Sequence, residues 1–214
     1  MLHIQSYVVN PIQENTYVVH DDTLEALVID CGAFFSEEHL AIVNYLRSNN
    51  LKPRHLLCTH GHLDHCWGNI TIYKEFGLKP EVMADDDFLI TQLDKQARDL
   101  FGIELKGEIP PVDRFLSDGD GIFFGTHEVK VIATPGHTPG SAVFWCESEN
   151  IAFTGDTLFH LSIGRTDFER GSYPDMMKSL TKLKQILPPA TTLYTGHGGS
   201  TDMGTELREN LYLR

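Results

Sequence analysis

Histidines and a carboxylate lie closest together in the segment 59–65, which reads Thr-His-Gly-His-Leu-Asp-His. His60 and His62 are two residues apart, so in an extended chain both imidazoles point to one side and can bind the same metal ion. Asp64 and His65 follow where the chain is expected to turn, and they can bind a second ion. A polar surface turn is the alternative, but four potential ligands beside an apolar stretch fit metal binding better.

Three later loops repeat this arrangement, in which an apolar strand ends in threonine, then glycine, then a side chain that can bind metal. They are Thr134-Pro135-Gly136-His137, Thr154-Gly155-Asp156 and Thr195-Gly196-His197. A single loop of this kind is more often a plain turn. Four strand ends that each deliver a ligand are not explained by packing alone, and the carboxyl ends of strands are where open α/β sheets hold their sites.

Together the four loops supply five histidines and two carboxylates, whereas a single zinc ion uses about four donors, one of them water at a catalytic site. We assign His60, His62 and His137 to a first ion, and Asp64, His65 and His197 to a second, with Asp156 bridging them. Asp64 and Asp156 are also the carboxylates assigned to catalysis. Water held between the two ions is expected to become hydroxide near neutral pH and to act as the nucleophile. Two divalent ions are expected, zinc first, with iron or manganese as alternatives.

The segments that must position these loops alternate between strand and helix patterns. Apolar, β-branched or aromatic runs predict strands, and apolar residues at helical spacing predict helices. Strands are expected at 2–9, 16–20, 26–30, 54–59, 81–84 and 191–195, with hairpins between 112 and 155, and helices at about 36–49, 65–76, 86–101, 172–186 and 204–212. The acidic run 85–87 is interpreted as a helix start rather than a metal site. This mixed order predicts an α/β protein in which two sheets pack together with helices outside.

Composition narrows the classes of function. The chain has 214 residues, 41% of them hydrophobic and 22% charged, which suits one globular domain, 1–214. Its formal net charge is −13, so it lacks the positive surface that nucleic acid or an anionic membrane would attract. No apolar run approaches the ~20 residues of a membrane helix. No export signal is visible and the four cysteines form no C-x-x-C pair, so a cytoplasmic location is expected.

The motifs together resemble those of the metallo-β-lactamase superfamily, most closely its short glyoxalase II-like (hydroxyacylglutathione hydrolase-like) members. The matching segments, in order over nearly the full chain, are 60–65, 134–141 (TPGHTPGS), 155–159 (GDTLF) and 196–198 (GHG). The resemblance implies a four-layer αββα sandwich of two halves, about 1–110 and 111–214, with the metal site at one edge of the sheets. It also implies a hydrolase that cleaves a thioester of the S-2-hydroxyacylglutathione type through a metal-bridging hydroxide.

Two residues are candidates for contact with substrate. The segment 163–167 resembles one shared by short glyoxalase II-like proteins and persulfide dioxygenases, in which the position of Arg165 lies near the thiol carrier. The alternative is that Arg165 only pairs with Asp167 and braces the loop. His160 follows Asp156 by four residues and is a candidate for the pocket wall. Because 17 residues follow His197, a separate C-terminal glutathione-binding helical domain is not expected.

Three readings of the function remain open. The leading one is hydrolysis of a small-molecule thioester, since a thiolate leaving group, with a conjugate acid of pKa ~8.5, needs little acid help. The second is oxidation of a persulfide by one iron, for which His62, His137 and Asp156 could form a two-histidine, one-carboxylate triad. The third is a metal-binding module without catalysis. A nuclease or an exported β-lactamase is less favoured, and the sequence leaves the oligomeric state open.

Overall fold

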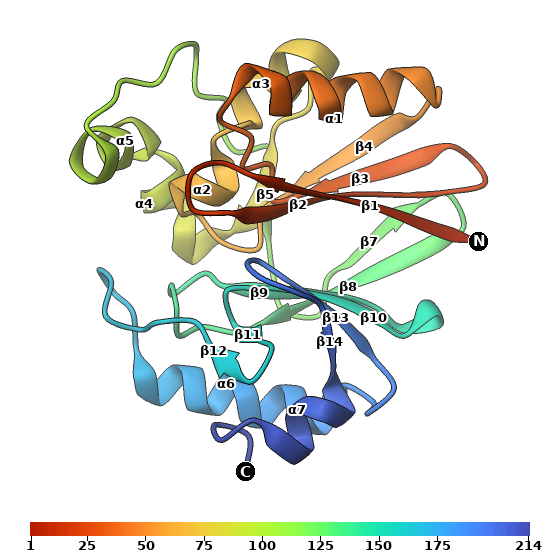
Figure 1. Ribbon diagram of the computed structural model, residues 1–214, viewed down its shortest axis with the longest axis vertical. Helices are drawn as coiled ribbons and strands as arrows, with labels where there is room; N and C mark the ends of the chain where they lie inside the picture. The colour runs from red at the N-terminus through yellow and green to blue at the C-terminus, as the bar shows by residue number, and fades with distance from the viewer.

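Two six-stranded β-sheets face each other at the centre of the computed structural model, which describes residues 1–214 (Figure 1). Helices cover the outer face of each sheet, so the layers run helix, sheet, sheet, helix. This arrangement confirms the αββα sandwich that the sequence predicts. None of the helices has the length and apolar character that crossing a membrane requires.

The first sheet is built by the first half of the chain, in the order β1-β2-β3-β4-β5-β6. Strands β1 to β3 form an antiparallel meander, and β3 to β6 run parallel to one another. The strands are β1 (Leu2–Val9), β2 (Glu14–Asp21), β3 (Glu25–Ile29), β4 (Lys52–Leu57), β5 (Pro80–Met83) and β6 (Arg114–Leu116). The helices of this half are α1 (Ser36–Ser48), α2 (Leu63–Cys66), α3 (Asn69–Phe76), η1 (Ala84–Asp86), α4 (Asp87–Ile90) and α5 (Leu93–Phe101).

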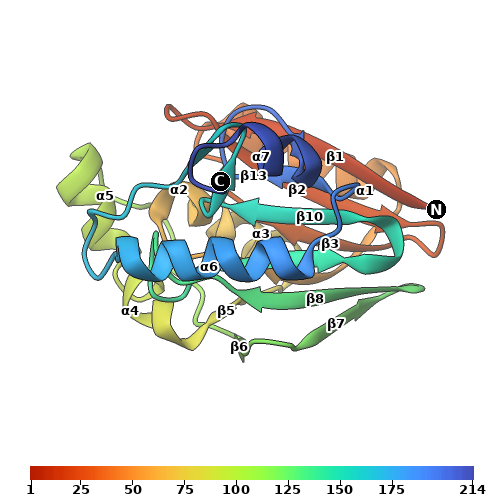
Figure 2. The same cartoon turned by 90° about the horizontal axis from the view of Figure 1, so that it is seen from below.

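The second sheet has the order β14-β13-β10-β9-β8-β7. Its strands are β7 (Gly121–Phe124), β8 (His127–Ala133), β9 (Ala142–Cys146), β10 (Ile151–Gly155), β13 (Thr192–Thr195) and β14 (Thr201–Asp202), and a separate hairpin is formed by β11 (Leu158–Phe159) and β12 (Ser162–Ile163). The helices are η2 (Glu147–Glu149), α6 (Tyr173–Ile186) and α7 (Met203–Glu209). Figure 2 shows α6 and α7 lying over the outer face of this sheet. Strands β10 and β13 are parallel, and α6 lies in the connection between them.

Side chains on a strand alternate between its two faces, so each sheet packs on both sides. The core therefore has one apolar layer between the two sheets and one between each sheet and its helices. In β3, Leu27 and Ile29 join the cluster between the two sheets. Val28, between them in sequence, packs outward into the cluster beneath α1, with Ile42 and Leu46 of that helix. A strand buried on both faces reads as a continuous apolar run, as the segment 26–29 does.

Two of the predicted helices are interrupted. The helix expected at 65–76 divides into α2 and α3 at Gly68, whose N–H donates to the carbonyl of Cys31 at 2.7 Å. A Cβ at Gly68 would lie 2.5 Å from the Cys31 Sγ, so this close approach requires glycine. The helix expected at 86–101 divides into η1, α4 and α5, whereas α6 begins as predicted, with Ser172 Oγ accepting the Asp175 N–H at 3.3 Å.

Candidate metal centre

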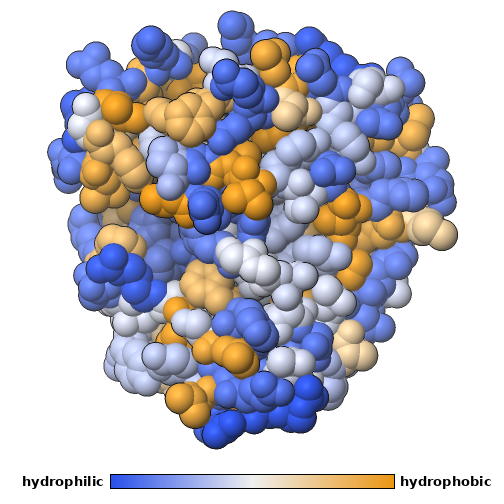
Figure 3. Space-filling model, in the orientation of Figure 1, coloured by the Kyte–Doolittle hydropathy of each residue, from blue (hydrophilic) through white to orange (hydrophobic).

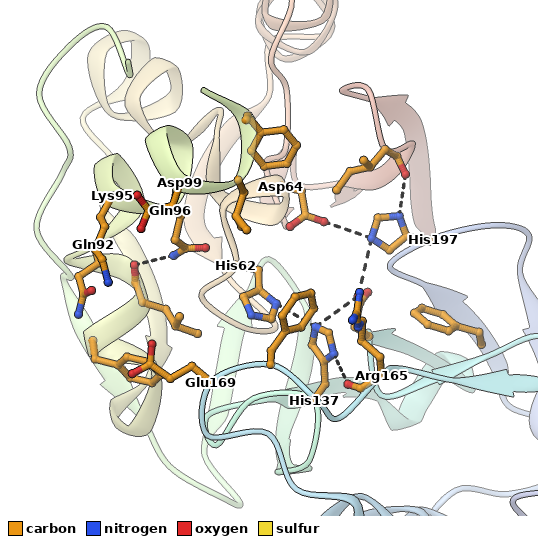
Figure 4. Close-up of a pocket in the computed structure, with 18 residues that line it drawn as sticks. His62, Asp64, Gln92, Lys95, Gln96, Asp99, His137, Arg165, Glu169 and His197 are labelled. Carbon is orange, nitrogen blue, oxygen red and sulfur yellow. Dashed lines mark hydrogen bonds and ion pairs between the residues drawn. The ribbon is translucent and has the colours of Figure 1, made fainter. Parts of the chain in front are cut away.

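All seven side chains predicted to bind metal meet at one edge of the sandwich, where four strands end. The loop after β4 comes from the first sheet, and the loops after β8, β10 and β13 come from the second. Figure 4 shows His62, Asp64, His137 and His197 pointing toward one another across the gap between these loops. Two sheets that each deliver ligands to the same edge therefore build the site jointly.

The first group contains His60, His62 and His137, and one nitrogen of each lies within 4.8 Å of the others. Nδ1 of His62 is 2.9 Å from Nε2 of His137. His60 is buried, and its Nε2 atom has no hydrogen-bond partner. Burial, followed by the neighbouring imidazoles, lowers the pKa of His60, and the same causes lower that of His62 to about 3. Neutral imidazoles with converging lone pairs are the form that binds metal.

The second group contains Asp64, His65 and His197, again within 4.8 Å of one another. Nε2 of His197 lies 3.2 Å from Oδ2 of Asp64 and 3.3 Å from Nε2 of His65. Burial alone would lower the pKa of His65 and His197, but the carboxylates around them outweigh it and raise both. The same carboxylates that favour a proton on these imidazoles would favour a cation, so metal ions and protons compete for this group.

Asp156 lies between the two groups. Its Oδ1 is 3.3 Å from Nε2 of His65, and its Oδ2 is 3.5 Å from Nε2 of His137. Oδ1 is buried and has no hydrogen-bond partner. A Cβ at Gly196 would lie 2.3 Å from this oxygen, so glycine is needed for the close approach. The carboxylate therefore has one oxygen near each group, as a bridging ligand requires, and the donor set with its unpaired buried atoms fits two divalent ions.

The residues from Val9 to His197 also match the family model described as the metallo-beta-lactamase superfamily. The chain belongs to this superfamily. It is 33% identical to the hydroxyacylglutathione hydrolase GloC of Haemophilus influenzae, over 99% of this chain and 98% of the relative. In structure it is similar to BLEG-1 B3 metallo-beta-lactamase, with a TM-score of 0.89 and 29% identity, covering 99% of both chains. It is also similar to TTHA1623 in a di-iron-bound form, with a TM-score of 0.86 and 30% identity, covering 98% of this chain and 100% of that chain.

In this member of the superfamily, a buried carboxylate that the sequence analysis did not assign orients His65. Asp30, at the end of β3, accepts hydrogen bonds from the Thr59 N–H and hydroxyl, both at 2.7 Å, and from Nδ1 of His65 at 3.0 Å. Glu14 is also buried, 3.8 Å from the same nitrogen, and burial raises the pKa of Glu14. A donor bond at Nδ1 leaves Nε2 of His65 free to bind metal. The position of Asp30, directly after an apolar strand and two residues before Gly32, was the signal available in the sequence.

Asp86 has a different role from the one predicted for the acidic run. It does lie in a helical segment, η1, but its carboxylate is buried and accepts the N–H groups of Gly61 at 2.8 Å and Gly140 at 2.7 Å. It also accepts the Thr138 hydroxyl at 2.7 Å. Asp86 therefore fastens the loop that carries His60 and His62 to the loop that follows His137. No local pattern in the sequence distinguishes this aspartate from its neighbours.

A pocket of about 620 Å³ is lined by five of the seven predicted ligands, His62, Asp64, His137, Asp156 and His197. Its walls come from α4, α5, the loop after β12 and the loop before β2. The space-filling view shows the surface hollowed between the helices of the first half and the loops of the second (Figure 3). Phe168 covers one side of the first ligand group, with its ring edge-on to His62 at a centroid distance of 4.9 Å.

The two candidate substrate residues have different positions. Arg165 lines the pocket, and its guanidinium also forms a bidentate pair with Asp167 at 2.6 and 2.7 Å and lies 4.3 Å from the Phe168 ring centroid. His160 is not part of the pocket wall, so its predicted position was wrong. Its half-exposed ring turns instead toward Thr201 Oγ1 at 3.2 Å and Glu206 Oε1 at 3.4 Å.

Proposed function

We propose that this metallo-β-lactamase superfamily member is a metal-dependent hydrolase that cleaves small-molecule thioesters of the S-2-hydroxyacylglutathione type. The observation that carries the proposal is the complete set of seven donors in two groups that share Asp156. The similarity to the Haemophilus influenzae hydroxyacylglutathione hydrolase over nearly the full length of both chains supports the substrate class.

The residues of this chain would hold the ions and orient the ligands. His60, His62 and His137 would bind one ion, and Asp64, His65 and His197 the other, with Asp156 contacting both. When bound, the ions supply a hydroxide nucleophile at neutral pH and polarise the carbonyl of the substrate. Zinc, iron and manganese all suit this donor set.

Two hydrogen bonds fix the histidine tautomers that binding needs. Nδ1 of His137 donates to the carbonyl of Arg165 at 2.7 Å, and Nδ1 of His65 donates to Asp30. Both rings then present Nε2 to the ions, in the orientation that outer hydrogen bonds usually impose on metal-binding histidines. The ring of Phe168 packs against His62 on one side of the first group. A thiolate leaving group requires no strong acid, so ligands and a shaped pocket are sufficient.

The test is thiol release from S-lactoylglutathione by protein reconstituted with zinc, iron or manganese. Release by any of these forms, at a rate that falls when the metal is removed, supports the proposal. Two competing reactions belong in the same experiment. A β-lactam is tested because of the similarity to BLEG-1, and oxygen uptake with a persulfide tests the one-iron alternative. Turnover of either one without thiol release would overturn the thioester proposal, and bound metal with no turnover would favour the non-catalytic module.

A further inference from the structure

Helix α5 is fixed to the loop that carries the metal ligands. The side-chain oxygen of Gln96 accepts the Leu63 N–H at 3.0 Å, and its amide nitrogen donates to the carbonyls of Gly61 at 3.2 Å and Leu89 at 2.9 Å. The residues of α5 that line the pocket are therefore held at a set position relative to the metal centre. Any group there can recognise a part of the substrate remote from the reacting bond.

Lys95, beside Gln96, is the cation of this pocket that has no partner. Its ammonium lines the pocket and forms no ion pair or hydrogen bond within the chain. The other lining cation, Arg165, is committed to Asp167 and to the Phe168 ring. Figure 4 shows Lys95 and Gln92 on the far side of the pocket from His197. An anionic group at the distal end of a bound thioester would therefore meet Lys95.

Two carboxylates share this distal wall. Asp99 lies four residues after Lys95, on the same side of α5, and Glu169 reaches the pocket from the opposite loop (Figure 4). A polyphosphate carrier would be repelled by Asp99 and by a chain whose net charge is already −13, and more weakly by Glu169, whose carboxylate lies 4.0 Å from Nε of Arg170. A carrier with one carboxylate and one ammonium group matches the wall.

We propose that Lys95 is a specificity-determining residue that binds a carboxylate of an amino acid-like or peptide-like thiol carrier. Asp99 and Glu169 would face the ammonium group of the same carrier. This inference rests on the proposed thioester hydrolysis and names the part of the substrate that the metal centre does not contact. It assigns to α5 the recognition of the carrier.

The experiment compares S-lactoylglutathione, which carries carboxylates and an ammonium, with S-lactoyl-N-acetylcysteamine, which carries neither, and with lactoyl-coenzyme A. In the metal-loaded wild-type enzyme, kcat/KM should be highest for the glutathione thioester and lowest for the coenzyme A thioester. Lys95→Ala should lower the ratio of kcat/KM for glutathione over N-acetylcysteamine about fivefold, as expected for one partly exposed charge-assisted contact. The loss should appear in KM, shrink at high salt, and be reversed in Lys95→Arg.

Lys74→Ala is the matched control, because Lys74 is an exposed lysine on α3 outside the pocket and its removal changes the net charge equally. The inference is overturned if Lys95→Ala leaves the substrate ratio at the wild-type value, or if lactoyl-coenzyme A is the best substrate. In both cases the thioester hydrolysis itself stands. If the wild-type enzyme releases thiol from none of the three thioesters, the proposed function is overturned together with the inference.

Discussion

Replacing Asp30 by asparagine should affect the two groups of predicted ligands unequally. Asp30 contacts His65 of the second group directly, and it reaches His60 of the first group only through the Thr59 hydroxyl, which lies 3.1 Å from Nδ1 of His60. The carboxylate accepts three hydrogen bonds, two from Thr59 and one from Nδ1 of His65. An asparagine oxygen can still accept the Thr59 N–H, but the amide nitrogen then faces Nδ1 of His65 and cannot accept its proton. His65 must leave that donor unpaired or move the proton to Nε2, the atom needed for metal binding.

The magnitude follows from the burial of this contact. Asp30 is 2% exposed and His65 is fully buried, so an unpaired donor costs about 1–3 kcal/mol, equivalent to roughly 5- to 150-fold in binding. Loss of a residue that hydrogen-bonds to a metal ligand typically weakens metal affinity by about 10- to 100-fold, which lies within this range. We expect Asp30→Asn to weaken the second ion's binding 10- to 100-fold and to change the first ion's binding less than threefold.

Zinc titration of the metal-free protein against a chromophoric chelator measures both affinities. Asp22→Asn is the control, because it removes an equal charge from an exposed position just after β2, at the end of that strand remote from the metal centre. Circular dichroism shows whether each variant folds. Unchanged affinity at both sites, or a loss confined to the His60, His62 and His137 site, would refute the assigned role of Asp30.

Three further outcomes are expected. Asp156→Ala should abolish the shared ligand, so the protein retains at most one ion by elemental analysis, and two ions with a wild-type rate would contradict the bridge. Asp86→Ala should destabilise the fold by roughly 3–5 kcal/mol in urea unfolding, because three buried donors lose their acceptor, and a change below 1 kcal/mol would contradict its role. Burial alone would raise the pKa of Asp21, but hydrogen bonds from Thr126 and Thr23 outweigh it and lower this pKa. The stability gained is therefore complete above the unfolded pKa of ~3.9 and lost as the pH falls below it, so wild type should lose stability more steeply than Asp21→Asn between pH 4 and 2, and equal slopes would oppose this.

The four loops that carry the seven predicted ligands can be recognised in the sequence because each follows an apolar run that ends in threonine and contains a glycine beside a ligand. Strand ends are local features, so their positions can be read from short stretches of sequence. The same reasoning did not find Asp30 or Asp86, because their partners lie 25 or more residues away and are brought close only by the packing of strands and loops. Local pattern likewise could not show that Gly68 meets Cys31 and interrupts a helix.

His160 illustrates the limit of arguing from spacing alone. Its distance of four residues from Asp156 suggested a place in the pocket, but His160 lies in the turn of the hairpin formed by β11 and β12. The direction of that turn depends on contacts with Thr201 and Glu206, near the end of the chain. Arg165, beyond the hairpin, returns to the pocket wall.

We propose that two ions, held by seven side chains of this chain, serve the hydrolysis of a thioester. The decisive experiment titrates metal-free protein with zinc while following both bound metal and thiol release from S-lactoylglutathione. Thiol release should rise to its maximum as the second ion per chain binds. A maximal rate at one ion per chain, or no thiol release with two ions bound, would contradict this proposal.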